Sequence, residues 1–185
     1  MFSFFSGEQV MVKRGIFVGR FQPFHIGHLE VIKKIIEDVD EVIIIVGSSQ
    51  YSHTPDNPFT AGERISMIRK VLEEEGIQLS RIWIIPVPDV HQHALWVSQI
   101  VGYSPKFDVV YANEPLTHRL FNEAGFKVEP MPFTKREFYS ATEIRKRILD
   151  GLEWEKLVPR TVGKFIKDID GDVRLLDLNK TDKVD

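Results

Sequence analysis

The residues best suited to chemistry in this sequence are two histidines, His25 and His28, with Gly27 between them. An apolar run at residues 15–18 precedes them and an amphipathic helical pattern follows, so they fall at a turn between a strand and a helix. The first N–H groups of a helix have no partner within it and its dipole is positive there, which favours an anion. Gly27 would let a ligand approach the backbone closely. The stretch therefore predicts a site for the phosphates of a nucleotide.

A second stretch of similar chemistry lies at Ser140, Thr142 and Arg145. Ser140 and Glu143 have the spacing of a capping box, which predicts that a helix begins there. Its start would offer free N–H groups and two hydroxyls, and Arg145 would add a guanidinium fork that fits phosphate oxygens. Taken alone, Ser-x-x-Glu is more simply read as an ordinary helix start. Two such starts facing one cleft would suit a polyphosphate.

Residues 19–28, which read GRFQPFHIGH, resemble the HxGH signature of the nucleotidyltransferase superfamily in the long form typical of archaeal nicotinamide mononucleotide (NMN) adenylyltransferases. Residues 140–145 resemble the second signature, SxTxxR, with Ala141 where many relatives carry Gly or Ser. The resemblance extends over residues 11–169. It implies transfer of AMP from ATP to NMN, which gives NAD and pyrophosphate.

Other activities of the same superfamily remain as alternatives. Pantetheine-phosphate adenylyltransferases and cytidylyltransferases share the first signature, but cytidylyltransferases usually carry an RTxGIST-like second signature, which residues 136–142 do not match. A further alternative, from a different class, is a nucleotide sensor that does not catalyse. The intact histidines and arginine argue against it.

The resemblance also implies roles for individual residues. His25 and His28 would contact the triphosphate, with His28 stabilising the α-phosphorus during transfer, and Arg20 and Arg145 would neutralise phosphate charge. The residues expected to bind ATP further include Gly19, Phe21, Gly27, Ser140 and Thr142. Those expected to bind NMN are Ser48, Asp89, Trp96 and Asn113. Trp96 would stack on the pyridinium ring and Asp89 would lie near the carboxamide or the cationic ring. Mg²⁺ is expected to bind mainly through the phosphates of ATP, without a metal site built from protein ligands.

Four of the distinctive side chains have a second interpretation. Trp96 lies on an apolar helix face, where a tryptophan usually belongs to the core. His91 and His93 have the look of a metal-binding pair, but a surface loop is the commoner place for such residues. Arg64 is either a surface residue or one that turns into the site.

The composition excludes several other functions. A net charge of −3, with no run of five basic residues, argues against a nucleic-acid binder that relies on bulk electrostatics. The absence of Cys excludes disulfides and thiolate catalysis and is compatible with a cytoplasmic location. No stretch reaches the roughly 18 apolar residues of a membrane span. We therefore expect a cytoplasmic enzyme with small-molecule partners and, by resemblance to the archaeal relatives, a homo-hexamer.

Apolar runs alternate with amphipathic helical patterns along the chain, which is typical of a parallel sheet covered on both faces. We expect five strands, at residues 15–18, 41–47, 81–86, 107–112 and 126–130. The fold class is α/β, a Rossmann-like doubly wound sheet, of the HUP type by the resemblance. The expected organisation is a disordered N-terminal extension at 1–10, one nucleotidyltransferase domain at 11–170 and a C-terminal tail at 171–185. The loop at residues 48–59 leaves the sheet edge where ligands bind.

Helical spacing further predicts which side chains face the core. They are Leu29, Ile32, Ile36 and Val39; Ile65, Ile68 and Leu72; Leu116, Leu120 and Ala124; Ile144, Ile148 and Leu152; and Val162, Phe165, Ile166 and Ile169.

Overall fold

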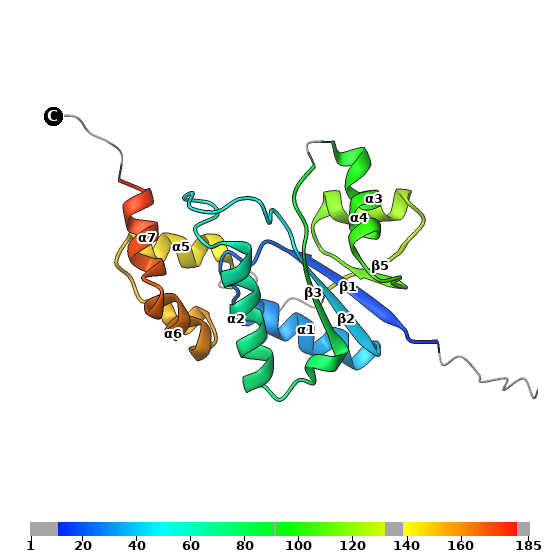
Figure 1. The fold of residues 1–185 in the computed structure, drawn as a ribbon, viewed down its shortest axis with the longest axis horizontal. Helices are drawn as coiled ribbons and strands as arrows, with labels where there is room; N and C mark the ends of the chain where they lie inside the picture. Colours follow the sequence, from blue (N-terminus) through cyan, green and yellow to red (C-terminus); the bar gives the residue numbers. More distant parts are fainter. Residues whose placement is uncertain (1–10, 91, 132–138, 181–185) are drawn as a thin grey trace, which may run out of the picture.

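The computed structural model describes residues 11–90, 92–131 and 139–180, and within them five strands form one parallel sheet in the order β3-β2-β1-β4-β5 (Figure 1). The strands are β1 (Arg14–Gly19), β2 (Glu41–Val46), β3 (Ile82–Pro86), β4 (Val109–Tyr111) and β5 (Lys127–Glu129). The five predicted strands are confirmed, with ends that differ by at most two residues. The extension expected at 1–10 lies outside the described residues.

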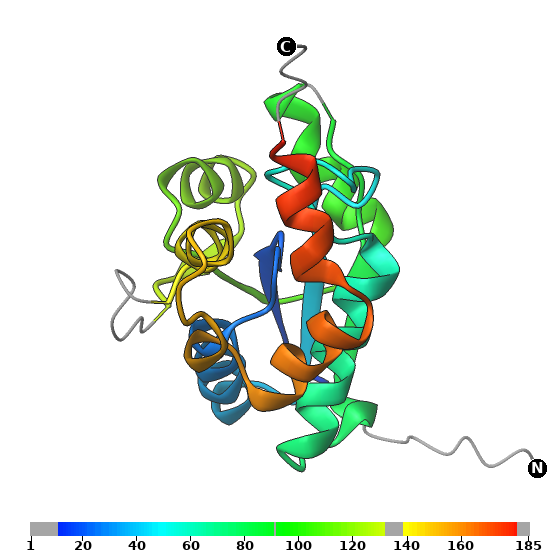
Figure 2. The ribbon, with the colours of Figure 1, turned by 90° about the vertical axis from the view of Figure 1, so that its left-hand side faces the viewer.

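Helices cover both faces of this sheet (Figure 2). One face carries α1 (Ile26–Asp38), α2 (Ala61–Glu74), α5 (Ala141–Leu149), α6 (Arg160–Asp168) and α7 (Gly171–Leu178). The other face carries α3 (His93–Tyr103) and α4 (Pro115–Glu123). Short 3-10 turns lie at Leu79–Arg81 and Glu155–Leu157. The doubly wound α/β prediction is confirmed, and no helix in the described part of the chain is both long and apolar enough to cross a membrane.

The central strands supply a separate core to each face of the sheet. Phe17 and Ile44 point into the cluster beneath α1 and α2, whereas Ile16 and Ile43 point into the cluster beneath α3 and α4. Successive side chains of a strand point to opposite faces, and a strand with helices on both sides must be apolar throughout. This explains why β1 and β2 read as continuous branched or aromatic runs.

The strand order determines where a ligand can bind. β1 lies between β2 and β4, so the chain moves outward in one direction through β2 and β3 and then crosses over to continue through β4 and β5. In such sheets the crevice opens at the carboxyl ends of the strands where this direction changes. The loops that follow β1, β2 and β3 all leave from this edge.

Some of the predicted helix faces are wrong. Leu116 is 42% exposed and Ala124 is also exposed, because α4 turns Phe121 toward the core instead. Leu152 is 56% exposed, since α5 ends at Leu149 and helical spacing no longer applies beyond it.

The tail predicted at residues 171–185 is also wrong for its first part. Residues Gly171–Leu178 form α7, and its Leu175 is fully buried. The short sequence between α6 and α7 holds Asp170 at a φ of 51°, and this tight turn folds α7 back onto α2 and the loop before it.

Candidate active site

The beginnings of α1 and α5 line one cavity of about 220 Å³, which we call the motif cavity. The two helix starts are separated by more than 100 residues in the sequence, yet both signature stretches contribute to the same walls. The lining residues are Arg20, Phe21, Gln22, His25, His28, Tyr139, Ser140, Ala141, Thr142 and Arg145. The structure thus brings together seven of the side chains expected at the ATP site.

His25 and His28 cap the first turn of α1 for each other. Ring Nδ1 of His25 accepts the backbone N–H of His28 at 3.3 Å, and ring Nδ1 of His28 accepts the backbone N–H of His25 at 3.2 Å. This is a capping box built from two imidazoles in place of a hydroxyl and a carboxylate. The rings stack with centroids 3.5 Å apart and 19° between their planes.

This arrangement determines the protonation of both rings. Because each Nδ1 accepts a hydrogen bond, the proton of each neutral ring must be on Nε2. Burial lowers the pKa of His25 to about 3, and burial together with the charge of His25 lowers the pKa of His28 well below its ordinary value. Both rings are therefore neutral at pH 7, and each can donate one hydrogen bond from Nε2.

Gly27 allows the two helix starts to approach each other. A Cβ atom at Gly27 would lie 3.1 Å from Cβ of Tyr139 and 3.2 Å from Nδ1 of His25, which is tighter than ordinary contact. Ser140 is the N-cap of α5, and its Oγ accepts the backbone N–H of Glu143 at 3.2 Å. The Ser140 hydroxyl can still donate its own proton to a ligand.

Phe21 and Gly19 support the motif rather than offer polar contacts. Phe21 is 1% exposed, and its ring packs edge-on against the ring of His28 with centroids 4.7 Å apart. A Cβ atom at Gly19 would lie 2.8 Å from the Phe21 ring, so Gly19 makes room for this ring. Gly19 does not line the motif cavity, which differs from its expected place at the ATP site.

Arg145 reaches the cavity from α5 with its guanidinium almost covered. Nη1 donates to the backbone oxygen of Gln22 at 3.0 Å, and Nη2 donates to Oδ1 of Asp56 at 3.3 Å. Burial lowers the pKa of Arg145, although the neighbouring Asp56 opposes this. Arg145 is therefore a positioned cation at the motif cavity.

A second cavity of about 670 Å³, which we call the Trp96 cavity, adjoins the first. Arg20 lines both. The lining residues are Arg20, Tyr51, Asp89, Val90, His93, Trp96, Leu116, Thr117 and Leu120. Leu116, which helical spacing had placed in the core, is exposed because it forms part of this wall.

Trp96 lies between a cavity and the core. Its ring lines the Trp96 cavity and also packs edge-on against Phe121 of the core, with centroids 5.5 Å apart. The core contact holds the ring in place while another part of it faces the cavity. His93 lines the same cavity, and His91 lies outside the described residues.

Asp89 is held by the loop that follows β2. Its Oδ1 accepts the backbone N–H of Ser48 at 3.1 Å, and its backbone N–H donates to Oε1 of Gln50 at 2.9 Å. Ser48, expected at the NMN site, is 6% exposed and lines neither cavity, so it supports Asp89 from behind. In the described chain no group of three or more His, Cys, Asp or Glu side chains could hold a metal ion.

Asn113 is not brought to either cavity. Its side-chain Nδ2 donates to the backbone oxygen of Met131 at 2.7 Å, and its Oδ1 accepts the Met131 N–H at 2.8 Å. The carboxamide thus replaces a rung of the sheet ladder where β4 and β5 end. The expectation that Asn113 binds NMN is not supported by this geometry, because backbone partners occupy both ends of its amide.

Arg64 is a supporting residue that sequence reasoning left undecided. It is fully buried, and its guanidinium donates to the backbone oxygens of Arg20, Gly47, Ser48 and Thr60 at 2.7–3.2 Å. Burial lowers the pKa of Arg64 to about 10, so it remains charged at neutral pH. It ties the ends of β1 and β2 together beneath the site. Arg64 lies four residues before the buried Ile68, a spacing that predicts the same buried face of the helix for both.

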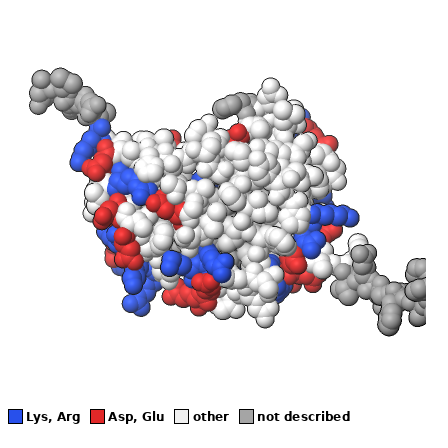
Figure 3. Space-filling model, in the orientation of Figure 1, with Lys and Arg blue, Asp and Glu red and all other residues white. Residues whose placement is uncertain are grey.

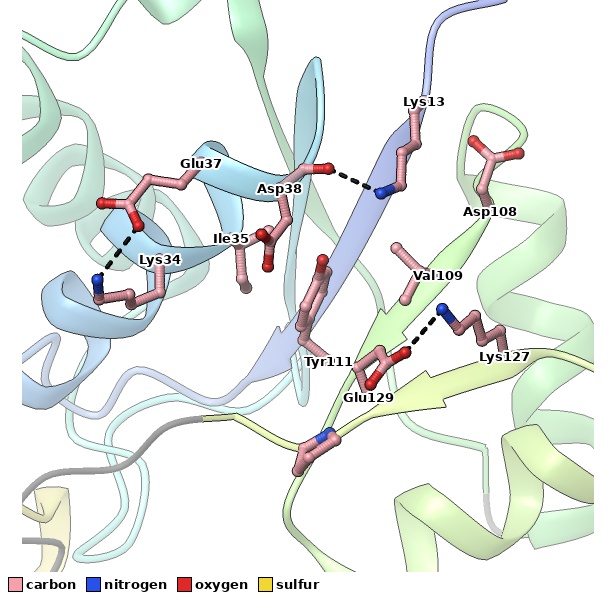
Figure 4. Close-up of a pocket in the computed structure, with 11 residues that line it drawn as sticks. Lys13, Lys34, Ile35, Glu37, Asp38, Asp108, Val109, Tyr111, Lys127 and Glu129 are labelled. Carbon is pink, nitrogen blue, oxygen red and sulfur yellow. Dashed lines mark hydrogen bonds and ion pairs between the residues drawn. The ribbon is translucent and has the colours of Figure 1, made fainter.

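A further cavity of about 520 Å³ lies between α1 and the strands β4 and β5, away from both signatures (Figure 4). Lys34 pairs with Glu37 at 3.2 Å, Lys127 pairs with Glu129 at 2.7 Å, and Lys13 Nζ donates to the Asp38 backbone oxygen. These charges compensate one another. None of the residues expected at the active site lines this cavity.

Comparison with known proteins agrees with the two signatures. A family model described as cytidylyltransferase-like matches residues 16–147. Three archaeal relatives are named nicotinamide-nucleotide adenylyltransferase. The one from Saccharolobus solfataricus is 54% identical over 93% of this chain and all of its own length. Those from Methanolobus tindarius and Archaeoglobus fulgidus are 51% and 49% identical, over 93% and 91% of this chain and 98% and 99% of their own lengths.

A solved structure with a similar fold is a bifunctional NMN adenylyltransferase/ADP ribose pyrophosphatase from Francisella tularensis, complexed with AMP and a manganese ion. It is 26% identical to this chain, with a TM-score of 0.74 over 90% of this chain and 52% of its own. The chain therefore belongs to the cytidylyltransferase-like family and, within it, to the nicotinamide-nucleotide adenylyltransferases.

Proposed function

We propose that this protein transfers AMP from ATP to NMN, releasing pyrophosphate and forming NAD, with the triphosphate in the motif cavity and the nicotinamide ring in the Trp96 cavity. One observation carries the assignment of the two substrates. The motif cavity, which is lined by two helix starts and by the two neutral histidines of α1, shares Arg20 with a larger cavity that contains Trp96 and Asp89. The first suits a polyphosphate and the second suits a flat cation.

The chemistry proposed for this site needs no general base. An oxygen of the NMN phosphate, already ionised at neutral pH, attacks the α-phosphorus of ATP. The bond from that phosphorus to the departing pyrophosphate breaks as the new one forms. The neutral His25 and His28 rings donate from Nε2 to phosphate oxygens, and Arg20 and Arg145 offset the charge that develops on the departing group. Catalysis then consists of positioning and charge stabilisation.

In the Trp96 cavity, Trp96 would stack on the pyridinium ring and Asp89 would offer negative charge to it. A tryptophan face attracts a cation, and the fixed carboxylate of Asp89 adds an electrostatic preference for the same charge. The bonds from Ser48 and Gln50 support this role, since they hold Asp89 in position before a ligand arrives.

A divalent cation, expected to be Mg²⁺, would accompany ATP. The polar side chains that line the motif cavity are imidazoles, hydroxyls, guanidinium groups and one amide, with no carboxylate among its described residues. This donor set fits phosphate oxygens better than a bare metal ion, so the cation would be held mainly by ATP and its own waters. Its contribution would be to neutralise phosphate charge.

We further propose that the protein acts as a homo-oligomer, a hexamer if the resemblance to the archaeal enzymes extends so far, in the cytoplasm where ATP is available. A face with few charges extends over β3 and α3 (Figure 3). Trp83, Leu95, Val101 and Tyr103 are each more than 40% exposed on these two elements. Apolar area of this kind favours association. The molar mass measured by light scattering would test it, and Tyr103→Glu is expected to lower that mass.

The activity is tested by measuring pyrophosphate release from ATP and Mg²⁺ with a panel of phosphorylated acceptors. NMN is expected to support turnover. Turnover with 4′-phosphopantetheine and none with NMN would show that the acceptor assignment is wrong. Binding of ATP without pyrophosphate release for any acceptor would favour a nucleotide sensor.

A further inference from the structure

The loop at residues 48–59 is attached firmly at both ends. At its beginning, Arg64 donates to the backbone oxygens of Gly47 and Ser48 at 2.7 and 3.1 Å. At its end, the side chain of Gln22 pairs with the backbone of Phe59, donating at 2.8 Å and accepting at 2.9 Å. Gln22 belongs to the first signature, so the attachment links the loop directly to the motif cavity.

Between these ends the chain makes a tight turn that presents Asp56. The backbone groups of Thr54 and Asn57 bond each other in both directions, at 3.1 and 3.3 Å, and Oγ1 of Thr54 also accepts the Asn57 N–H. Asp56 is thus held near the tip of a short closed turn. Its carboxylate accepts from Nη2 of Arg145 at 3.3 Å.

The two partners of this ion pair differ in their surroundings. The side chain of Arg145 is 8% exposed, whereas that of Asp56 is 80% exposed. Arg145 is also held by the backbone oxygen of Gln22, which cannot leave without unfolding the signature. Asp56 is therefore the exchangeable partner, and a triphosphate, which carries more negative charge than one carboxylate, would attract the same guanidinium more strongly.

We propose that Asp56 is a positioning residue that takes the place of a phosphate group at Arg145 while the motif cavity is empty, and that the triphosphate displaces it. This rests on the proposed function, in which Arg145 binds phosphate. The carboxylate keeps the guanidinium aimed at the cavity, and its negative charge competes with the incoming ligand. Because exposed ion pairs are weak, displacement is readily reversible.

The displacement also gives the loop two conformations that depend on the ligand. With Asp56 on Arg145 the tip of the turn is tied to α5. Once a phosphate occupies Arg145, the tip loses this tie to α5. Tyr51 of the same loop lines the Trp96 cavity, so the first substrate to bind would alter a wall of the second site.

Asp56→Asn tests the proposal, with inorganic pyrophosphate as the probe and isothermal titration as the measurement. The variant keeps the size and turn preference of the side chain but removes its charge. We expect pyrophosphate and ATP to bind about two- to fivefold more tightly, the range that corresponds to a weak exposed ion pair. Hydrogen exchange over residues 50–57 should rise on adding pyrophosphate to the wild type and should already be raised in the free variant.

Glu73→Gln is the matched control. It removes one carboxylate from an exposed ion pair, with Arg69 at 3.1 Å on the outer surface of α2, and changes the net charge equally. An Asp56→Asn variant whose pyrophosphate affinity equals that of Glu73→Gln, or is weaker than wild type, overturns the proposal. Turnover of the wild type with NMN distinguishes a failure of the role proposed for Asp56 from a failure of the proposed function. Turnover with an unchanged Asp56→Asn affinity rejects the role of Asp56 alone, whereas a wild type that binds neither ATP nor pyrophosphate rejects the proposed function itself.

Discussion

The imidazole rings of His25 and His28 stack 3.5 Å apart, and each accepts the backbone N–H of the other residue. This reciprocal bonding excludes a doubly protonated form of either ring, because Nδ1 would then be a donor. The signature histidines are therefore structural caps and hydrogen-bond donors at once. Several expectations about pH and mutation depend on this relationship.

Stability should fall as the pH drops below the ordinary range of histidine. The folded pKa of His25, about 3, lies below the unfolded value near 6.5, so the neutral ring stabilises the fold above about pH 6.5 and this contribution is lost toward pH 3. The slope should reach about 1.4 kcal/mol per pH unit for each buried ring. Urea unfolding at pH 7, 5.5 and 4.5 measures it. His25→Asn, which keeps a good N-cap, should reduce the dependence of stability on pH. Equal stability of the wild type at the three pH values would contradict the conclusion that both rings are neutral in the folded protein.

His28→Ala should lower kcat by about 10²- to 10³-fold with a modest change in KM, because it removes a donor aimed at developing charge. Loss of the cap should also cost about 1 kcal/mol of stability. Steady-state kinetics and thermal unfolding separate these effects. His118→Ala, on the outside of α4, is the control and should leave kcat unchanged. A raised KM with normal kcat would show that His28 only binds substrate.

Trp96→Ala should weaken NMN binding and leave ATP affinity intact, since its ring lines only the Trp96 cavity. A lost cation–π contact corresponds to about 1–2 kcal/mol. Titration with each substrate separately measures this. Trp96→Phe keeps the edge-on contact with Phe121 and should retain part of the affinity. If Trp96→Ala unfolds and Trp96→Phe binds NMN normally, the ring serves the core alone.

Arg64→Met should destabilise the fold by about 2–4 kcal/mol, because backbone oxygens that now accept from its guanidinium would lose their buried partner. Chemical denaturation measures the loss. Arg69→Met, on the exposed face of the same helix, should cost little because its pair with Glu73 is open to solvent. Equal stabilities for the two variants would refute the assignment of Arg64 as the tie between β1 and β2.

Arg174→Met should also lower stability, by about 1–3 kcal/mol, because this side chain binds both carboxylate oxygens of Glu63 and the backbone oxygen of Pro58. These bonds attach α7 to the start of α2. A thermal melt of the variant beside Arg119→Met, which disrupts an exposed pair on α4, tests the effect. Equal melting temperatures for the two variants would show that the contacts of α7 do not stabilise the fold.

Much of this protein is determined by local patterns that a sequence displays directly. The branched run at residues 41–46 predicts a buried strand, and Thr60 with Glu63 predicts a helix start. The two histidines flank a glycine at the point where a strand is followed by a helix. These features need only neighbouring residues, so the α/β class and the positions of both helix starts at the motif cavity were predictable, whereas the strand order was not. Resemblance in the signatures then indicated the chemistry.

Tertiary structure alone decided which distant groups meet. Helical spacing placed Leu116 in the core, whereas α4 turns Phe121 toward the core and Leu116 into the Trp96 cavity. Asn113 looked like a ligand and instead pairs with Met131, and Arg145 meets Asp56 from 89 residues away. Such partners are backbone atoms or side chains on other elements, and their positions depend on how the layers pack. A one-dimensional pattern carries no signal for them, because the same residue types at the same spacing would fit several packings.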